Sequence, residues 1–232
     1  MTDTATIAAI SRPILFSAPM VRALRSGTKT QTRRVINLSD RLGRFDSDGY
    51  SSVTDDRIVK ILWTNQNIPK VVPCPYGQPG DRLRVKEAAW MWCERRPNGK
   101  TATGRDRWWY VPMREAPIHY AADHPSMPML DVVSPNTVNK WGWRLKIGRF
   151  LPAWASRITL ENTGVRVERL QDISITDAMA EGVAETNANL RGLEPCMEWR
   201  YAYEDLWTEI NGTGSWAANP WVWVVEFRRI AQ

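Results

Sequence analysis

The last strand-forming segment of the chain is apolar on both of its faces. It reads Trp221-Val222-Trp223-Val224-Val225-Glu226-Phe227, in which one charge interrupts six large apolar side chains. A strand with one solvent-exposed face carries apolar side chains at every second position only. The segment therefore predicts a strand that is covered on both sides, inside a sheet with a substantial core.

Helices and further strands are predicted around it. Ser17 and Ser174 are suited to N-cap two short helices, which end at Gly27 and at Glu181-Gly182. A longer helix is predicted from about Pro195 to Asn211, with an apolar side formed by Trp199, Tyr203, Leu206, Trp207 and Ile210. Strand-forming runs cover 13–16, 58–63, 70–72, 82–87, 142–147, 157–160 and 165–170, the last two joined as a hairpin at Asn162-Thr163-Gly164. These elements predict an α+β fold.

Three stretches interrupt this pattern and are predicted to be insertions, at about 37–76, 93–140 and 186–220. The first is polar and rich in Gly and Ser, and the second opens with basic residues. We expect residues 12–232 to form a single domain that contains these insertions. Residues 1–11 are expected to be a flexible N-terminus.

The composition departs from the ordinary in its tryptophans and its charge. The chain of 232 residues has 13 Trp and a net charge of +6. Aromatic rings combined with cations are typical of proteins that bind RNA or single-stranded DNA, which are therefore the expected partners. Most of the tryptophans are expected in the core, since large aromatic side chains contribute mainly buried area, and some are expected to line a groove.

Few residues are of the kind that bind metals or form disulfides. Cys74, Cys93 and Cys196 show no CxxC spacing, and their odd number favours a reducing compartment, so a cytoplasmic protein is expected. With only His119 and His124 beside them, the ligand spacing fits no usual zinc pattern. No metal and no cofactor are expected. No stretch approaches the about 20 apolar residues of a membrane span, so no membrane partner is expected either.

The run Gly27-Thr28-Lys29-Thr30-Gln31-Thr32-Arg33-Arg34 has the composition of a functional site. It combines three cations with three hydroxyl groups and follows directly on the first short helix, which gives it a rigid support. Further along, Arg82, Arg84 and Lys86 share one face of a predicted strand, which either tracks phosphates or is simply solvated. For Lys29 and Arg34 the competing interpretation is likewise a solvated cationic edge, and for Glu181 it is a salt-bridge partner or an ordinary charge at a helix end.

The second insertion contains a candidate contact for nucleic acid. Its basic residues lead into two adjacent tryptophans, and the candidates are Arg95, Arg96, Arg105, Arg107, Trp108 and Trp109. Stacking of bases on aromatic rings beside cations is the usual way in which single strands are bound. The alternative is a mobile loop that only contributes solubility.

Several motifs taken together resemble the ASCH family. They are Gly27-x-Lys29-Thr30-x-Thr32-x-Arg34, the Gly80-Asp81 turn before a strand, the helix end Ala178-x-x-Glu181-Gly182, and the final Val224-x-Glu226-Phe227 strand. With its insertions and its Trp-rich end, the chain is similar to the larger family members of phages and prophages. The resemblance implies a PUA-like fold, in which a small β-barrel is flanked by helices and a cleft binds a nucleobase, a nucleoside or RNA.

The resemblance also implies candidate catalytic residues. Family members that hydrolyse N4-acetylcytidine use a Lys, a Thr and a Glu, which match Lys29, Thr32 and Glu181 here. Thr32 would be the nucleophile with Lys29 as its base, Glu181 would deliver a proton or activate water, and Arg34 would hold substrate or a developing oxyanion. Substrate contacts are expected from Arg34, Arg33, Thr30 and Lys86. In a regular strand Lys29 and Thr32 would point to opposite faces, so a bulge or turn would have to bring them together.

Two functions are compatible with these residues. The first is a hydrolase of a modified, N4-acylated pyrimidine or of RNA. The second is a reader that binds RNA, single-stranded DNA or a modified base without catalysis. Catalysis requires Thr32 and Glu181, whereas binding requires mainly the cations and aromatic rings.

Overall fold

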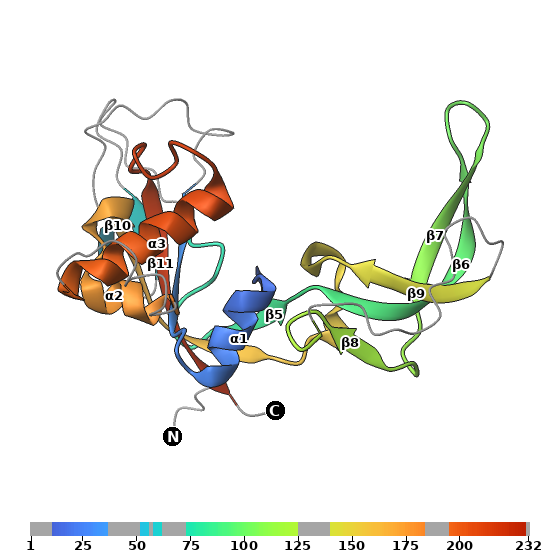
Figure 1. The fold of residues 1–232 in the computed structure, drawn as a ribbon, viewed down its shortest axis with the longest axis horizontal. Helices are drawn as coiled ribbons and strands as arrows, with labels where there is room; N and C mark the ends of the chain where they lie inside the picture. Colours follow the sequence, from blue (N-terminus) through green and yellow to red (C-terminus); the bar gives the residue numbers. More distant parts are fainter. Residues whose placement is uncertain are drawn as a thin grey trace, which may run out of the picture. The chain divides into compact units, whose positions relative to one another are not determined.

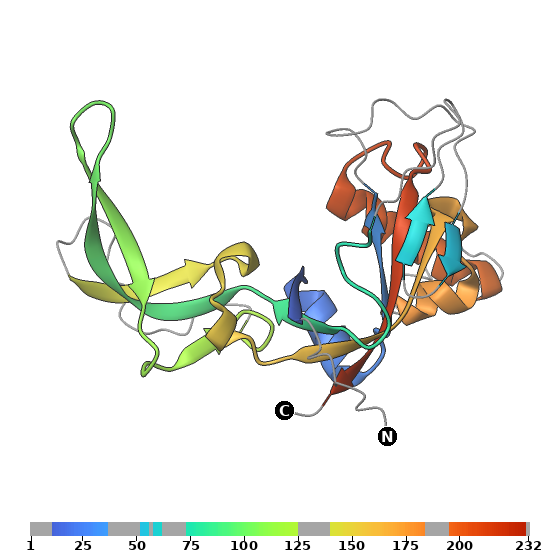
Figure 2. The same cartoon turned by 180° about the vertical axis from the view of Figure 1, so that it is seen from behind.

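The computed structural model describes residues 11–36, 52–55, 58–61, 73–124, 140–183 and 195–230. The chain divides into two compact units (Figures 1 and 2): unit 1 combines residues 1–13, 23–84 and 158–232, and unit 2 combines residues 14–22 and 85–157. The single domain expected over 12–232 stays a prediction. Apart from Ser11, the N-terminus expected to be flexible lies outside the described residues, as does the strand expected at 70–72.

A five-stranded sheet contains the strand predicted from the apolar closing segment. The strands follow the order β1 (Ser11–Leu15), β5 (Arg82–Lys86), β10 (Thr159–Arg169), β11 (Trp221–Ile230) and β2 (Gln31–Val35). Strand β11 pairs antiparallel with β10 on one side and with β2 on the other. The closing segment is therefore an inner strand of the sheet, as its apolar pattern predicts.

Both faces of β11 are covered. On one face Val222 and Val224 pack into a core with α2 (Ile175–Ala180) and α3 (Pro195–Asn211). Trp223 and Val225 alternate with them and are also buried. In Figures 1 and 2 the two helices lie over one face of β10 and β11. The hairpin of β3 (Ser52–Asp55) and β4 (Ile58–Ile61) lies over the other.

The helices form largely where the sequence predicts them. Helix α1 (Ala18–Ser26) ends at Gly27, whose φ of 81° suits a glycine. The Ser174 hydroxyl accepts a hydrogen bond from the Asp177 backbone N–H and caps α2. In α3 the predicted apolar side ends one turn early. Ile210 is 50% exposed in the last turn of the helix, whereas Trp207 is buried.

The predicted hairpin at Asn162-Thr163-Gly164 is wrong. Residues 159–169 form the single strand β10, and its register against β11 shifts between Asn162 and Gly164. The Asn162 side chain is buried and donates a hydrogen bond to the Tyr76 carbonyl, while Gly164 lies close against Glu226. These contacts hold the polar turn-forming residues in a β-bulge, so the chain continues in the same direction.

The described strands do not close into the small barrel that the family resemblance implies. They form an open path from β1 to β2, although the broader α+β class is confirmed. Next to β2, the Thr30 backbone N–H donates to the Ala180 carbonyl at 2.8 Å, and Lys29 forms an isolated β-bridge with Glu181. At the start of β2 the end of α2 occupies the edge that a closing strand would need.

Unit 2 is built around a long hairpin. Strand β6 (Ala89–Lys100) pairs with β9 (Trp141–Lys146) along one edge, and with β8 (Ile118–Tyr120) and then β7 (Asp106–Pro112) along the other. In Figure 1 the β6–β7 hairpin extends beyond the end of β9. The basic stretch predicted as a nucleic-acid contact is thus regular strand over most of its length, and the loop alternative applies only to its tip.

One face of the unit 2 sheet supplies the core of this unit. Its buried members are the alternate β6 residues Ala89, Met91 and Cys93 together with Leu151 and Ala155. The last two come from the segment that contains the short 3-10 turns η1 (Gly148–Phe150) and η2 (Ala153–Ala155). In unit 1, η3 (Leu170–Asp172) joins β10 to the residues before α2.

Candidate functional site

The run singled out by the sequence lies where α1, β2 and α2 meet in unit 1. Gly27 ends α1, and the chain reaches β2 through Lys29 and Thr30. The Lys29 backbone N–H donates to the Ala23 carbonyl at 3.1 Å, which ties the run to the helix before it. The bridge between Lys29 and Glu181 then places the end of α2 beside the start of β2.

Lys29 and Glu181 form a buried ion pair. The Lys29 Nζ lies 2.7 Å from the Glu181 Oε2 and donates a second hydrogen bond to the Glu181 backbone carbonyl at 2.8 Å. The two side chains are 0% and 3% exposed. Glu181 caps the C-terminus of α2, where the helix dipole disfavours a carboxylate. The Lys29 ammonium compensates for this by binding both the carboxylate and a carbonyl at the helix end.

Arg33 is held by three carboxylates. Its guanidinium contacts Glu168 at 2.9 Å, Asp177 at 3.0 Å and Glu181 at 3.4 Å, and its side chain is fully buried. Gln31, two residues earlier in β2, donates to the Asp177 carbonyl at 3.2 Å. Gln31 and Arg33 therefore point to the same face of β2, toward α2.

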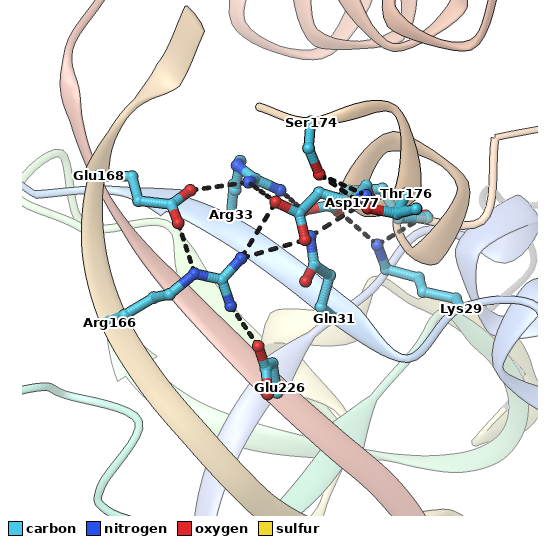
Figure 3. A network of polar contacts seen from close by, with 10 residues as sticks. Lys29, Gln31, Arg33, Arg166, Glu168, Ser174, Thr176, Asp177 and Glu226 are labelled. Carbon is cyan, nitrogen blue, oxygen red and sulfur yellow. Dashed lines mark hydrogen bonds and ion pairs between the residues drawn. The ribbon is translucent and has the colours of Figure 1, made fainter. Parts of the chain in front are cut away.

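Arg166 extends the cluster toward β11. Figure 3 shows its guanidinium with Glu168, Asp177 and Glu226 around it. Because Glu168 and Asp177 each contact both Arg33 and Arg166, the two arginines are linked through shared carboxylates. We call the set Arg33, Arg166, Glu168, Asp177 and Glu226 the arginine–carboxylate network.

Burial and neighbouring charge shift two pKa values in this region. Burial lowers the pKa of Lys29, and the adjacent Glu181 carboxylate acts in the opposite direction. For Asp177, burial raises the pKa, but Arg33 and Arg166 outweigh it and hold the pKa below its ordinary value. Lys29 therefore gives up its proton more readily than an exposed lysine, and Asp177 stays ionised.

Thr32 is not part of this ion cluster. It is buried in β2 opposite Val225, between Gln31 and Arg33 in sequence. Strand alternation places Thr32 and Arg34 on the face opposite to Gln31 and Arg33. The structure thus brings Lys29, Arg33 and Glu181 together and directs Thr32 and Arg34 to the other side of β2.

The other two predicted substrate contacts are Thr30 and Lys86. The Thr30 side chain is exposed, and its backbone carbonyl accepts a hydrogen bond from the Phe227 N–H at 2.8 Å. Lys86 belongs to unit 2, where its ammonium donates to the Arg149 carbonyl.

The predicted nucleic-acid contacts all lie on the β6–β7 hairpin of unit 2. Arg95 and Arg96 come from β6, Trp108 and Trp109 from β7, and Arg107 precedes these tryptophans on β7. Arg105 stands in the exposed turn between the strands. The two tryptophans are 40% and 60% exposed, which makes their rings accessible to a ligand.

Sequence reasoning missed most of the arginine–carboxylate network. The sequence predicts only helix capping for Asp177, and it predicts no role in the site for Gln31, Arg166, Glu168 and Glu226. The sequence spacing of some of these residues could have indicated that they lie together. Asp177 and Glu181 are four residues apart at the end of a helix, which places both carboxylates on one side. Gln31 and Arg33 follow Lys29 at every second position, as neighbours on one strand face do.

The described residues include neither a metal-binding cluster nor a membrane-spanning helix. In this part of the chain no group of three or more His, Cys, Asp or Glu side chains is arranged to hold a metal ion. Among the described helices none is long and apolar enough to cross a membrane.

No known protein family, curated protein or solved structure was found to match this chain.

Proposed function

We propose that the chain is an ASCH-type protein whose unit 1 is a PUA-like domain with an open sheet in place of the closed barrel, and that it hydrolyses an N4-acylated pyrimidine, either free or within RNA. The contact between Lys29 Nζ and the Glu181 carboxylate, 2.7 Å apart across 152 positions of sequence, carries this proposal. Both residues belong to the family motifs, Lys29 to Gly27-x-Lys29-Thr30 and Glu181 to the helix end Ala178-x-x-Glu181-Gly182.

The pair has the properties that proton transfer requires. A lysine can act as a base only in its neutral form. The ion pair holds Lys29 as an ammonium, so Lys29 must first pass a proton to Glu181, and burial of the pair favours this transfer. Arg33 donates a hydrogen bond to the other oxygen of the Glu181 carboxylate at 3.4 Å. The negative charge of Glu181 is therefore shared between Lys29 and Arg33. Lys29 is therefore suited to accept a proton, and Glu181 to pass it on.

In the proposed reaction, Lys29 and Glu181 each have one role in moving a proton. A water oxygen forms a bond to the acyl carbon, and the bond between that carbon and N4 breaks. Lys29 takes the proton that the water loses, and Glu181 directs it to the departing N4 amine. Thr32, on the other face of β2, is not needed as a nucleophile in this scheme. Because Lys29 and Glu181 are buried, a substrate must first displace the side chains that cover them.

A non-catalytic reader is the second candidate, and the β6–β7 hairpin favours it. Its exposed tryptophans and cations are the groups that hold single-stranded nucleic acid without any catalytic residue. A reader would retain the Lys29–Glu181 pair as a structural link between β2 and α2.

The test is incubation with N4-acetylcytidine and with RNA that contains it, followed by mass spectrometry of the products. A hydrolase releases acetate and leaves cytidine, a ribonuclease shortens the RNA, and a reader changes neither. Glu181→Gln should abolish deacetylation, while Lys100→Arg on the exposed hairpin should leave it intact. Deacetylation by the Glu181→Gln protein at the normal rate would refute the assigned site.

A further inference from the structure

One face of the unit 2 sheet carries tryptophans that are not part of its core. Along β6, Ala89, Met91 and Cys93 point into the core, so the residues between them point to the opposite face. The register places aromatic side chains from β7, β8 and β9 beside them on that face. We call this set the tryptophan face: Trp90, Trp92, Trp109, Trp141, Trp143 and His119.

Ring contacts confirm that these side chains share a face. Trp92 on β6 and Trp143 on β9 are cross-strand partners, with ring centroids 5.6 Å apart. The His119 ring on β8 lies 4.9 Å from the Trp143 ring. Trp141 is opposite Glu94, and Trp109 is opposite Arg96. Rings from three strands are thus in contact at Trp92, Trp143 and His119, and the register places Trp90, Trp141 and Trp109 on the same face.

This surface is partly accessible to solvent. Five of its six side chains are half-buried, whereas Trp109 is 60% exposed and Leu145 on the same face is 46% exposed. Of the tryptophans in the described part of the chain, only Trp207 and Trp223 are buried, and both belong to unit 1. Trp154, Trp199 and Trp216 are partly buried and pack against the cores. Fewer than half of the tryptophans in this part of the chain thus lie in or against a core, so the expectation that most of them do is wrong. Tryptophans gathered on an accessible face point to a flat ligand.

Three cations lie at the hairpin end of the tryptophan face. Arg96 and Lys140 both contact Glu94, at 2.7 and 3.3 Å, and the Lys140 ammonium lies 5.1 Å from the centre of the Trp141 ring. Arg107 shares the face of Trp109, two positions along β7. These three cations face one carboxylate, Glu94, which leaves an excess of two positive charges. The flat ligand is therefore expected to be an anion.

We propose that the tryptophan face binds an unpaired polynucleotide strand. Successive bases stack on the tryptophan rings, and Arg96, Arg107 and Lys140 contact the phosphates. A carbohydrate would also stack on tryptophan, but it would not require the excess of cations. The inference deepens the nucleic-acid binding in the proposed function, and it does not depend on catalysis by Lys29 and Glu181.

The same geometry separates the five candidates that lie on the hairpin strands into two groups, while Arg105 lies in the turn between the strands. Trp109, Arg96 and Arg107 lie on the tryptophan face. Arg95 and Trp108 lie on the opposite face, where the Arg95 guanidinium covers the Trp108 ring at 4.0 Å. Since Trp108 already has a cation over its ring, it offers less surface for stacking. Trp108 therefore provides a matched control for Trp109, one residue away on the same strand.

The test measures the anisotropy of fluorescent oligonucleotides of about 12 residues, a length within the range that such surfaces occupy. Oligo-dT, oligo-rU and a duplex of equal length are titrated with the full chain. Trp109→Ala should weaken single-strand binding roughly 5- to 100-fold, which is the loss of one stacked base. Trp108→Ala should change it less than about twofold. Replacing Arg96 and Arg107 with Gln should reduce the salt dependence of binding.

Three results would overturn the proposal. They are equal losses from Trp108→Ala and Trp109→Ala, equal affinity for duplex and single strand, and no binding of either oligonucleotide by the unmodified protein. Near-UV circular dichroism confirms that each variant is folded. Deacetylation of free N4-acetylcytidine is measured in parallel. If it is absent while the Trp109-dependent binding is present, the proposed hydrolase fails and the tryptophan face stands.

Discussion

A Cβ atom on Gly182 would lie 2.8 Å from the Cβ of Lys29. Gly182 follows the end of α2 with a φ of 76°, and the same Cβ would lie 2.9 Å from that of Ala23. The absence of a side chain at this position is what allows the end of α2 to approach Lys29 and the end of α1. The glycine in the Glu181-Gly182 motif is thus explained by packing and by backbone conformation.

Gly182→Ala is therefore expected to destabilise unit 1 by about 2–4 kcal/mol, from the cost of a left-handed alanine and of overpacking together. Gly27→Ala is the matched control. Its φ of 81° is similar, but nothing lies within 4 Å of the added Cβ. It should cost only about 1 kcal/mol. Urea unfolding measures both. Equal losses would show that the close approach to Lys29 contributes nothing.

Removing one partner of the Lys29–Glu181 pair leaves a buried charge behind. Glu181→Gln is expected to lower the free energy of unfolding by about 3–5 kcal/mol, because Lys29 and Arg33 lose a shared carboxylate. In the double variant Lys29→Met, Glu181→Gln the stranded charge on Lys29 is gone. Its total loss should be smaller than the sum of the two single losses by about 0.5–3 kcal/mol. Additive losses in urea unfolding would contradict direct coupling of the pair.

Asp177 is expected to make unit 1 sensitive to acid. Its pKa in the folded chain lies below the ordinary value of 3.8, since Arg33 and Arg166 outweigh the effect of burial. Between the pKa of Asp177 in the folded chain and its ordinary value in the unfolded chain, the unfolded chain binds more protons than the folded chain. In this pH range stability therefore rises with pH. The contribution is complete above pH 3.8 and is lost as the pH falls through the folded pKa.

The stability difference between the unmodified protein and Asp177→Asn should therefore be largest near neutral pH and shrink below about pH 4. Urea unfolding at a series of pH values measures it. Asp106→Asn, on the exposed hairpin of unit 2, is the control, because it removes a carboxylate outside the arginine–carboxylate network. A difference that stays constant down to the lowest pH would mean that the ionisation of Asp177 does not stabilise the fold.

The sequence predicted the elements better than their connections. The apolar pattern of Trp221–Phe227 and the capping serine at 174 depend on neighbours along the chain, and both predictions are confirmed. The bulge at Asn162 depends on Tyr76 and Glu226, and the edge of β2 depends on Ala180. These partners lie about 60 to 150 positions away in the sequence. Local turn chemistry does not contain those partners, so it predicted a hairpin at Asn162 and gave no sign of the contact between β2 and α2.

The site shows the same division. Lys29 and Glu181 could be selected from short motifs, but the motifs do not tell which side chains share a face of a strand. Strand alternation separates Thr32 from Lys29 in the described structure. The arginine–carboxylate network was missed because each of its members, taken alone, is an ordinary surface charge in the sequence. Only the packing of β2, β10, β11 and α2 brings them together.

The last prediction concerns Lys29→Arg, which separates the two proposed functions. The substitution retains a positive charge that can still bind the Glu181 carboxylate, but an arginine does not lose its proton in proteins. If Lys29 accepts the proton from water, Lys29→Arg should lower kcat for deacetylation by about 10²- to 10⁴-fold. Binding of single-stranded oligonucleotides should stay unchanged, because the tryptophan face belongs to unit 2.

Thr32→Val completes the experiment, because it removes the predicted nucleophile while keeping the shape of the side chain. If water is the nucleophile, this variant should retain its turnover, whereas a covalent role for Thr32 requires that turnover be lost. A fully active Lys29→Arg protein would exclude Lys29 as the base. Glu181 would then be the remaining group of the pair able to take the proton, and the lowered pKa of Lys29 would be a consequence of burial without a catalytic purpose.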